Sequence, residues 1–201
     1  MKRTVVFLLA ALVLVSVISI LPIHGEAAIY DSVIRLHVLA NSDSEADQAL
    51  KLAVRDDLLT RTRVLLADVK TRDEAETVLK GAMDSLTVTA RETVMREGYD
   101  YPVRITLGQE QYPTRRYENL AFPAGEYLSL RVLIGEAAGE NWWCVLFPPL
   151  CLSAATAKNE AEEAFLAAGL TGEQYRIITD SENTKYRLRF KILEVAKDLF
   201  D

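Results

Sequence analysis

The spacing of apolar residues changes twice along the chain, and each change marks a different kind of secondary structure. Residues 32–40 form an apolar run with Arg35 and His37 interleaved, which predicts a first strand. From Ser44 onward apolar residues recur every three or four positions, which predicts a helix capped by Ser44. A second such stretch follows Thr71 and Glu74, which have capping-box spacing, and predicts a second helix ending near Gly98.

A period of two replaces the helical spacing in the following third of the chain. Apolar and polar residues alternate at 103–107 and at 128–134, which predicts two strands with one buried face each. Residues 141–147 are apolar on both faces, and we expect them to pair back on 128–134 as a hairpin partner across a turn at 135–140.

The last third predicts further elements and completes the fold class. Helices are expected at 156–168 and after Thr171, and alternation at 186–191 predicts a last strand. We therefore expect an α+β fold with an antiparallel sheet and helices packed on one side.

The N-terminus indicates export. Lys2 and Arg3 precede an almost entirely apolar run at 5–23, and the small residues Gly25 and Ala27 suit the −3 and −1 positions of a cleavage site after Ala27. Residues 1–27 are therefore predicted to be a cleaved signal peptide or, because the run is nearly long enough to span a bilayer, a retained membrane anchor. Residues 28–201 are predicted to form a single domain outside the cytoplasm.

Composition narrows the possible partners and cofactors. The 201 residues carry a net charge of −6 and show no basic cluster, which argues against a nucleic-acid partner. No glycine-rich phosphate loop or metal-ligand spacing is present in the sequence, so we predict no cofactor and no metal. The polar turn at 41–44 is interpreted as a structural strand-to-helix turn, with a binding role as the alternative.

Both tryptophans and both cysteines fall within 141–151. Export would allow a Cys144–Cys151 disulfide, although two buried thiols are the alternative. Cys144 and His37 are also the only possible pair for a thiol enzyme, but the apolar setting of Cys144 disfavours a thiolate. We predict no catalytic site. We predict instead that partner binding involves five residues, with plain core packing as the competing interpretation: Trp142, Trp143, Phe147, Pro148 and Pro149.

Several blocks resemble one known family. Residues 34–44, 47–51, 122–127, 131–132 and 141–151 resemble the signatures of stage II sporulation protein R. The resemblance implies export from the forespore into the space between the forespore and mother-cell membranes. It further implies a signal, not an enzyme, which triggers a membrane-embedded aspartic peptidase to process the precursor of the mother-cell sigma factor E. Two alternatives stay open, an exported Cys/His thiol hydrolase and an envelope structural or wall-binding module attached to the membrane through residues 5–23.

Overall fold

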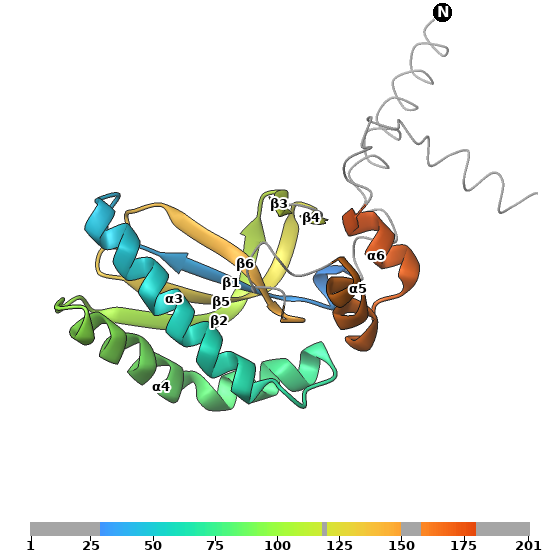
Figure 1. The fold of residues 1–201 in the computed structure, drawn as a ribbon, viewed down its shortest axis with the longest axis horizontal. Helices are drawn as coiled ribbons and strands as arrows, with labels where there is room; N and C mark the ends of the chain where they lie inside the picture. Colours follow the sequence, from blue (N-terminus) through green and yellow to red (C-terminus); the bar gives the residue numbers. More distant parts are fainter. Residues whose placement is uncertain (1–28, 118–119, 150–157, 180–201) are drawn as a thin grey trace, which may run out of the picture.

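A four-stranded sheet forms the centre of the molecule. The computed structural model describes residues 29–117, 120–149 and 158–179 (Figure 1). In the sheet the strand order is β2-β5-β1-β6, and β3 and β4 form a separate two-stranded sheet. The strands are β1 (Ile34–Leu39), β2 (Val103–Tyr112), β3 (Arg115–Tyr117), β4 (Leu120–Phe122), β5 (Gly125–Ile134) and β6 (Asn141–Phe147). The helices are α3 (Glu45–Leu65), α4 (Arg72–Arg96), α5 (Lys158–Ala167) and α6 (Gly172–Thr179). The predicted α+β class is confirmed.

Strand β1 lies between β5 and β6, which corrects one sequence prediction. It runs parallel to β5 and antiparallel to β6. The sheet is therefore mixed, and the expected hairpin pairing of 141–147 with 128–134 is wrong. All six residues of β1 are buried, and a strand covered on both faces fits the interior of a sheet better than its edge.

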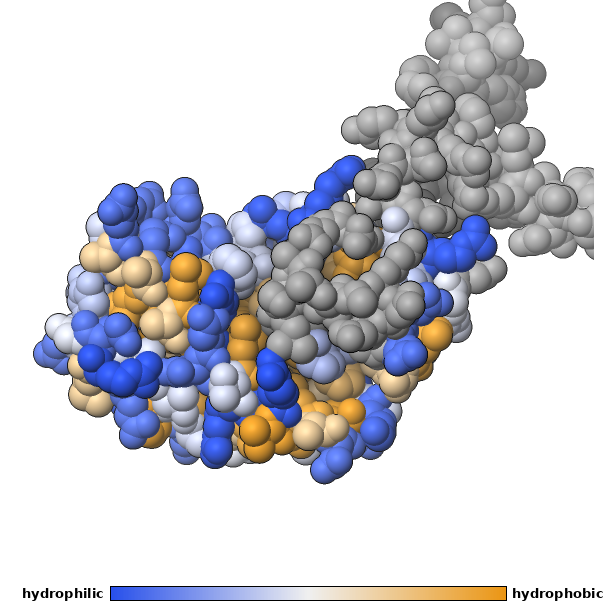
Figure 2. Space-filling model, in the orientation of Figure 1, coloured by the Kyte–Doolittle hydropathy of each residue, from blue (hydrophilic) through white to orange (hydrophobic). Residues whose placement is uncertain are grey.

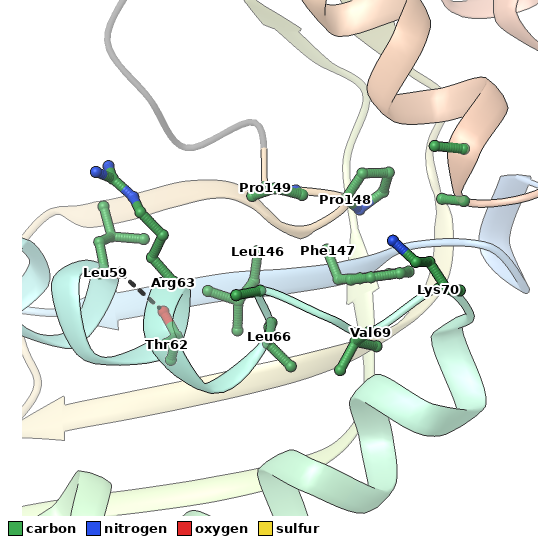
Figure 3. Close-up of a pocket in the computed structure, with 13 residues that line it drawn as sticks. Leu59, Thr62, Arg63, Leu66, Val69, Lys70, Leu146, Phe147, Pro148 and Pro149 are labelled. Carbon is green, nitrogen blue, oxygen red and sulfur yellow. Dashed lines mark hydrogen bonds between the residues drawn. The ribbon is translucent and has the colours of Figure 1, made fainter.

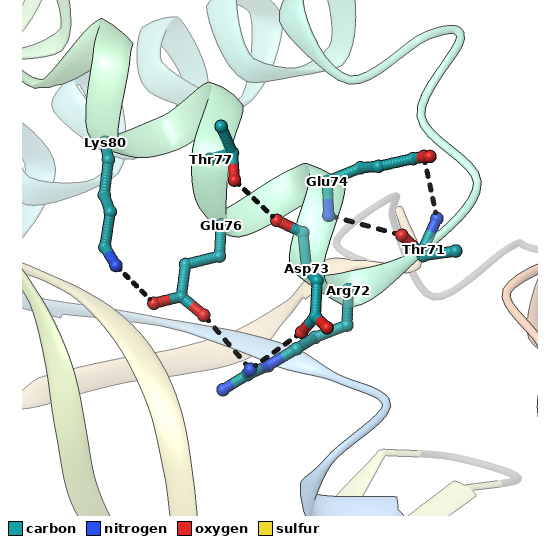
Figure 4. A network of polar contacts seen from close by, with 7 residues as sticks. All are labelled: Thr71, Arg72, Asp73, Glu74, Glu76, Thr77 and Lys80. Atoms are coloured by element: carbon teal, nitrogen blue, oxygen red, sulfur yellow. Dashed lines mark hydrogen bonds and ion pairs between the residues drawn. The ribbon is translucent and has the colours of Figure 1, made fainter.

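Two long helices cover the first face of the sheet. Ser44 caps α3 by accepting a hydrogen bond from the amide of Asp47 at 3.1 Å, as predicted. Thr71 and Glu74 form the predicted capping box at the start of α4 (Figure 4). Burial of the apolar faces of α3 and α4 against the sheet provides most of the stability of these helices.

The outer surface of these helices is mostly hydrophilic. Glu76, which is partly buried, pairs with Arg72 at 3.0 Å and with the exposed Lys80 at 2.7 Å, but i,i+4 pairs of this kind stabilise a helix only slightly. Figure 2 shows that apolar residues reach the surface on this side in separate patches between hydrophilic ones. No helix within the described ranges is both long and apolar enough to span a bilayer. The segment 1–27, predicted to be a signal or an anchor, lies outside the described residues.

The second face of the sheet has a smaller apolar cluster of its own. Tyr127 from β5 and Val145 from β6 pack there with Phe122 from β4, Phe165 from α5 and Ile178 from α6. The expectation of helices on one side thus holds for the two long helices, whereas α5 and α6 contribute to the cluster on the opposite face. Phe165 of α5 and Ile178 of α6 remove the apolar surfaces of Tyr127 and Val145 from water on that face. The predicted strand at 186–191 lies outside the described residues.

Candidate partner-binding surface

A network of polar side chains, here called the clamp, positions the start of β6, the strand that carries both tryptophans. It consists of Asn41, Ser42, Asp43, Asp47, Gln48 and Lys51. Asp47 is 4 % exposed and accepts hydrogen bonds from Ser42 Oγ at 2.5 Å and from Asn41 Nδ2 at 2.9 Å. These bonds, first from Ser42 and then from Asn41, hold the pKa of Asp47 below its usual value although burial acts in the opposite direction. Asp43 Oδ1 accepts from the amide of Glu140 at 2.6 Å, which joins this turn to the residue before β6.

A buried lysine completes the clamp. Lys51 is 4 % exposed, and its Nζ donates to Gln48 Oε1 at 2.5 Å and to the carbonyl of Glu140 at 2.9 Å. Burial lowers the pKa of Lys51. A Cβ at Gly139 would collide with the backbone of Ser42, so the turn and the β5–β6 connection approach as closely as glycine allows. These contacts are consistent with the structural interpretation of the 41–44 turn.

The two tryptophans of β6 lie on opposite faces of the sheet, as their alternation predicts. Trp142 is 37 % exposed, and the Arg55 guanidinium of α3 lies 4.2 Å from its ring centroid. Trp143 is half-buried, and the Arg115 guanidinium lies 3.3 Å from its ring centroid. Both rings therefore contact a cation through their faces, an arrangement that is favourable at partly exposed sites.

Beside Trp143, His37 belongs to a polar network and not to a catalytic pair. Its Nδ1 lies 2.8 Å from Glu110 Oε1 and its Nε2 lies 2.7 Å from Asn141 Oδ1. Burial alone would raise the pKa of Glu110, but hydrogen bonds from His37 and Ser129 and the nearby positive charges outweigh it and lower that pKa.

The structure separates the two residues of the hypothetical thiol enzyme. His37 pairs with Trp143 in the strand register, whereas Cys144 pairs with Leu36. Because successive residues of a strand point to opposite faces, the side chains of His37 and Cys144 lie on opposite sides of the sheet. Cys144 packs in the helix-covered core, so the geometry that a Cys/His thiol hydrolase requires is not formed.

The most unusual residue near this surface is Arg35, which the sequence analysis treated only as part of a strand. It is fully buried, its guanidinium lies 4.6 Å from the Tyr112 ring centroid, and its Nη2 donates to Tyr117 Oη at 2.7 Å. Its Nε donates to the carbonyl of Cys144 at 3.1 Å. Its Nη1 has no hydrogen-bond partner within the described ranges. Arg35 and His37 are two positions apart in an apolar run, so a strand would place both on the same face. This spacing is the sequence feature that indicates a polar face of β1.

The end of β6 is mostly buried. Phe147 is 3 % exposed and Pro148 is buried, whereas Pro149 is exposed. A register shift between Ile34 and Arg35 places Phe147 opposite Ile34 in the helix-covered core, whereas strict alternation along β6 would place it on the same face as Trp143. Because Phe147 and Pro148 are buried, a partner could contact them only through the pocket that they line.

That space is a pocket of about 290 Å³ beside the end of β6 (Figure 3). Its walls come from the end of α3 and the loop after it, from the end of β6, and from the end of α5. Leu59, Leu66 and Phe147 make these walls largely apolar. The pocket could not be predicted from the sequence, because its walls come from three segments that are far apart in the chain.

The described residues include neither a free thiol nor a metal site. No cysteine in the described part of the chain is free, but Cys151 lies outside it, so the Cys144–Cys151 disulfide stays a prediction. Within the described ranges no group of histidine, cysteine, aspartate and glutamate side chains could hold a metal ion.

The comparisons with known proteins identify the family. The model of stage II sporulation protein R matches residues 30–157, which include the clamp, β6 and most of the pocket. The chain belongs to the stage II sporulation protein R family. This membership supports a role in sporulation.

A curated relative and the solved structures complete the comparison. The stage II sporulation protein R of Bacillus subtilis (strain 168) is 39 % identical over 121 residues, which are 60 % of this chain and 54 % of that relative. The chain thus spans about half the length of the curated relative it matches. No solved structure matches it.

Proposed function

We propose that this protein is an exported signal of endospore formation that triggers a membrane-embedded aspartic peptidase to process the precursor of sigma factor E. The observation that carries the proposal is the family match over residues 30–157. The apolar run at 5–23 behind Lys2 and Arg3 supports export into the space between the forespore and mother-cell membranes. In that oxidising location Cys144 and Cys151 form a disulfide.

The proposal assigns contact with the peptidase to the β6 region. Trp142 and Pro149 are exposed and Trp143 is half-buried, so these three residues are accessible to a partner. Aromatic residues that contact cations supply a large contact area at low entropic cost. Phe147 and Pro148 participate as walls of the pocket beside this region.

Co-expression in a host that does not sporulate tests the proposal. The full chain, the peptidase and the sigma precursor are produced together, and processing is followed by immunoblot. We expect processing only when all three are present, and loss of processing when residues 1–27 are removed so that the chain is not exported. Equal processing with and without this protein would contradict the proposal.

A pair of variants in the same assay tests the surface. Trp142→Ala should reduce processing several-fold while the melting temperature changes by only a few degrees, because the side chain is 37 % exposed. Val64→Ala, at a residue that is 69 % exposed on α3, is the control and should leave processing unchanged. Normal processing by Trp142→Ala would remove this residue from the contact surface.

A further inference from the structure

Apart from two cationic side chains, the described side chains that line the pocket beside the end of β6 are apolar or, at Thr62, already hydrogen-bonded. Its walls include Leu59, Leu66, Val69, Leu146 and Phe147. Thr62 is the uncharged polar residue among the described lining residues, and its hydroxyl donates within α3 to the carbonyl of Leu58 at 2.8 Å. Small-molecule sites usually combine apolar walls with a few polar groups that fix orientation. A pocket whose walls are apolar apart from two exposed cations suits an inserted apolar side chain better.

The volume sets the size of that side chain. An apolar protein cavity of about 150 Å³ accommodates benzene. A pocket of about 290 Å³ therefore accepts one large apolar side chain or two smaller ones. The full acyl chains of a phospholipid are too large for it.

The charged residues of the pocket are all cationic among those that the structure describes. Arg63 and Lys70 line it, and no described lining residue is an aspartate or a glutamate. Both cations are exposed, and neither forms an ion pair with a described residue. The whole chain has a net charge of −6, whereas the charged residues in the described lining of the pocket are all positive. An apolar pocket with two free cations is complementary to an apolar side chain that has a carboxylate nearby in sequence.

We propose that this pocket binds an acidic–apolar segment of the partner protein, in which a leucine or an aromatic residue enters the pocket and flanking carboxylates contact Arg63 and Lys70. The inference rests on the proposed function and deepens it, because it states the chemistry of the peptidase segment that the protein recognises.

One segment of this chain has the same chemistry, which makes it the competing occupant. Asp198, Leu199, Phe200 and Asp201 place two apolar residues between two carboxylates. They lie outside the residues matched by the family, whereas the walls from α3, the following loop and β6 lie inside the match. A recognition pocket built within the matched region is better explained by a partner that the family shares than by this tail.

The processing assay supplies the first test. Arg63→Glu combined with Lys70→Glu should reduce processing at least tenfold, and Ala167→Trp, which fills the pocket from α5, should do the same. The matched controls are Arg61→Glu on the same helix as Arg63 and Glu163→Trp on the same helix as Ala167, neither of which lines the pocket. Melting temperatures are measured for all variants. Wild-type-like processing by the pocket variants overturns the inference, whereas absence of processing with the unmodified chain overturns the proposed function instead.

A binding experiment tests the pocket without the peptidase. The full chain is titrated with acetyl-Asp-Leu-Phe-Asp-amide and, as the control, acetyl-Lys-Leu-Phe-Lys-amide, and amide shifts are followed by NMR. We expect the acidic peptide to shift residues around Leu59 and Val69, at least tenfold more tightly than the basic one. Equal affinities, or shifts elsewhere, overturn the inference. Binding that appears only after deletion of residues 194–201 assigns the pocket to this chain's own tail and also overturns the partner assignment.

Discussion

The two faces of the central sheet are held together by different means. The face under α3 and α4 is closed by aliphatic side chains such as Leu36, Leu58 and Leu130, all with no exposed surface. The opposite face buries Arg35 completely, and His37 and Ser129 almost completely. Apolar packing tolerates many arrangements of similar volume, whereas a buried polar network is stable only when nearly every member has a partner. We infer that the first face sets most of the stability and that the second face fixes the arrangement of β1, β2, β3 and β6.

The largest predicted effect concerns the apolar face. Leu130→Ala should lower the free energy of unfolding by about 2–5 kcal/mol, because it removes a fully buried side chain from a central strand and leaves a cavity. Urea denaturation measures the change. Val88→Ala, at a residue that is 52 % exposed on α4, is the control and should change the free energy by less than about 0.5 kcal/mol. A loss below about 1 kcal/mol for Leu130→Ala would mean that this face does not dominate stability.

The next effect concerns the covalent link that we predict at the edge of the same face. Replacing both Cys144 and Cys151 with alanine should lower the free energy of unfolding by about 2–3 kcal/mol, since the bond closes a short loop. Mass spectrometry of alkylated, unreduced protein counts the thiols beforehand. Two alkylated cysteines in exported protein would show that the bond is absent.

A smaller effect distinguishes charge from volume on the polar face. Arg35→Met keeps most of the side-chain volume and removes a buried cation that has no carboxylate partner within the described ranges. It should therefore cost only about 1–2 kcal/mol of unfolding free energy. Arg35→Ala adds a cavity among the aromatic rings and should cost more, about 3 kcal/mol or above. Equal losses for the two variants would show that the guanidinium hydrogen bonds, and not packing, dominate at this position.

The smallest effect is a difference in pH dependence between the faces. The pKa of Glu110 in the fold is lower than its usual value of 4.5, because hydrogen bonds and nearby cations outweigh burial. A carboxyl with a lowered pKa stabilises the fold above its unfolded pKa, and this contribution disappears as the pH falls through the folded pKa. Glu110→Gln should therefore flatten the loss of stability between about pH 5 and pH 3. Glu92→Gln, at an exposed residue on α4, is the control. Urea midpoints across this range provide the measurement, and identical acid profiles for Glu110→Gln and the unmodified protein would contradict the prediction.

The sequence predicted local features well because they depend on residues that are close together in the chain. The α4 capping box depends on Thr71 and Glu74, and the limits of β6 at Asn141 and Phe147 follow from its apolar run and the prolines behind it. The position of β1 could not be predicted in this way. Its partners β5 and β6 lie far along the chain, and no local pattern records which strands pair.

The candidate surface was predictable to the same limited degree. Alternation alone placed Trp142 and Trp143 on opposite faces, and the structure agrees. The bulge that moves Phe147 to the other face is a tertiary effect of pairing with Ile34 and Arg35. The contact of Arg115 with Trp143 depends on β3, which the sequence analysis did not predict.

The central position of β1 also determines when the chain can fold. The hydrogen bond from Arg35 to the carbonyl of Cys144 joins residues 109 positions apart in the chain. The hydrogen bond between His37 and Asn141 joins residues 104 positions apart. A chain that emerges N-terminus first, from a ribosome or through a membrane, therefore holds an apolar strand without β5 until residue 134 has emerged and without β6 until residue 147 has emerged. Folding of such long-range pairings is slow, and the exposed strand is open to aggregation meanwhile. Chains interrupted before β6 should thus fail to form the four-stranded sheet.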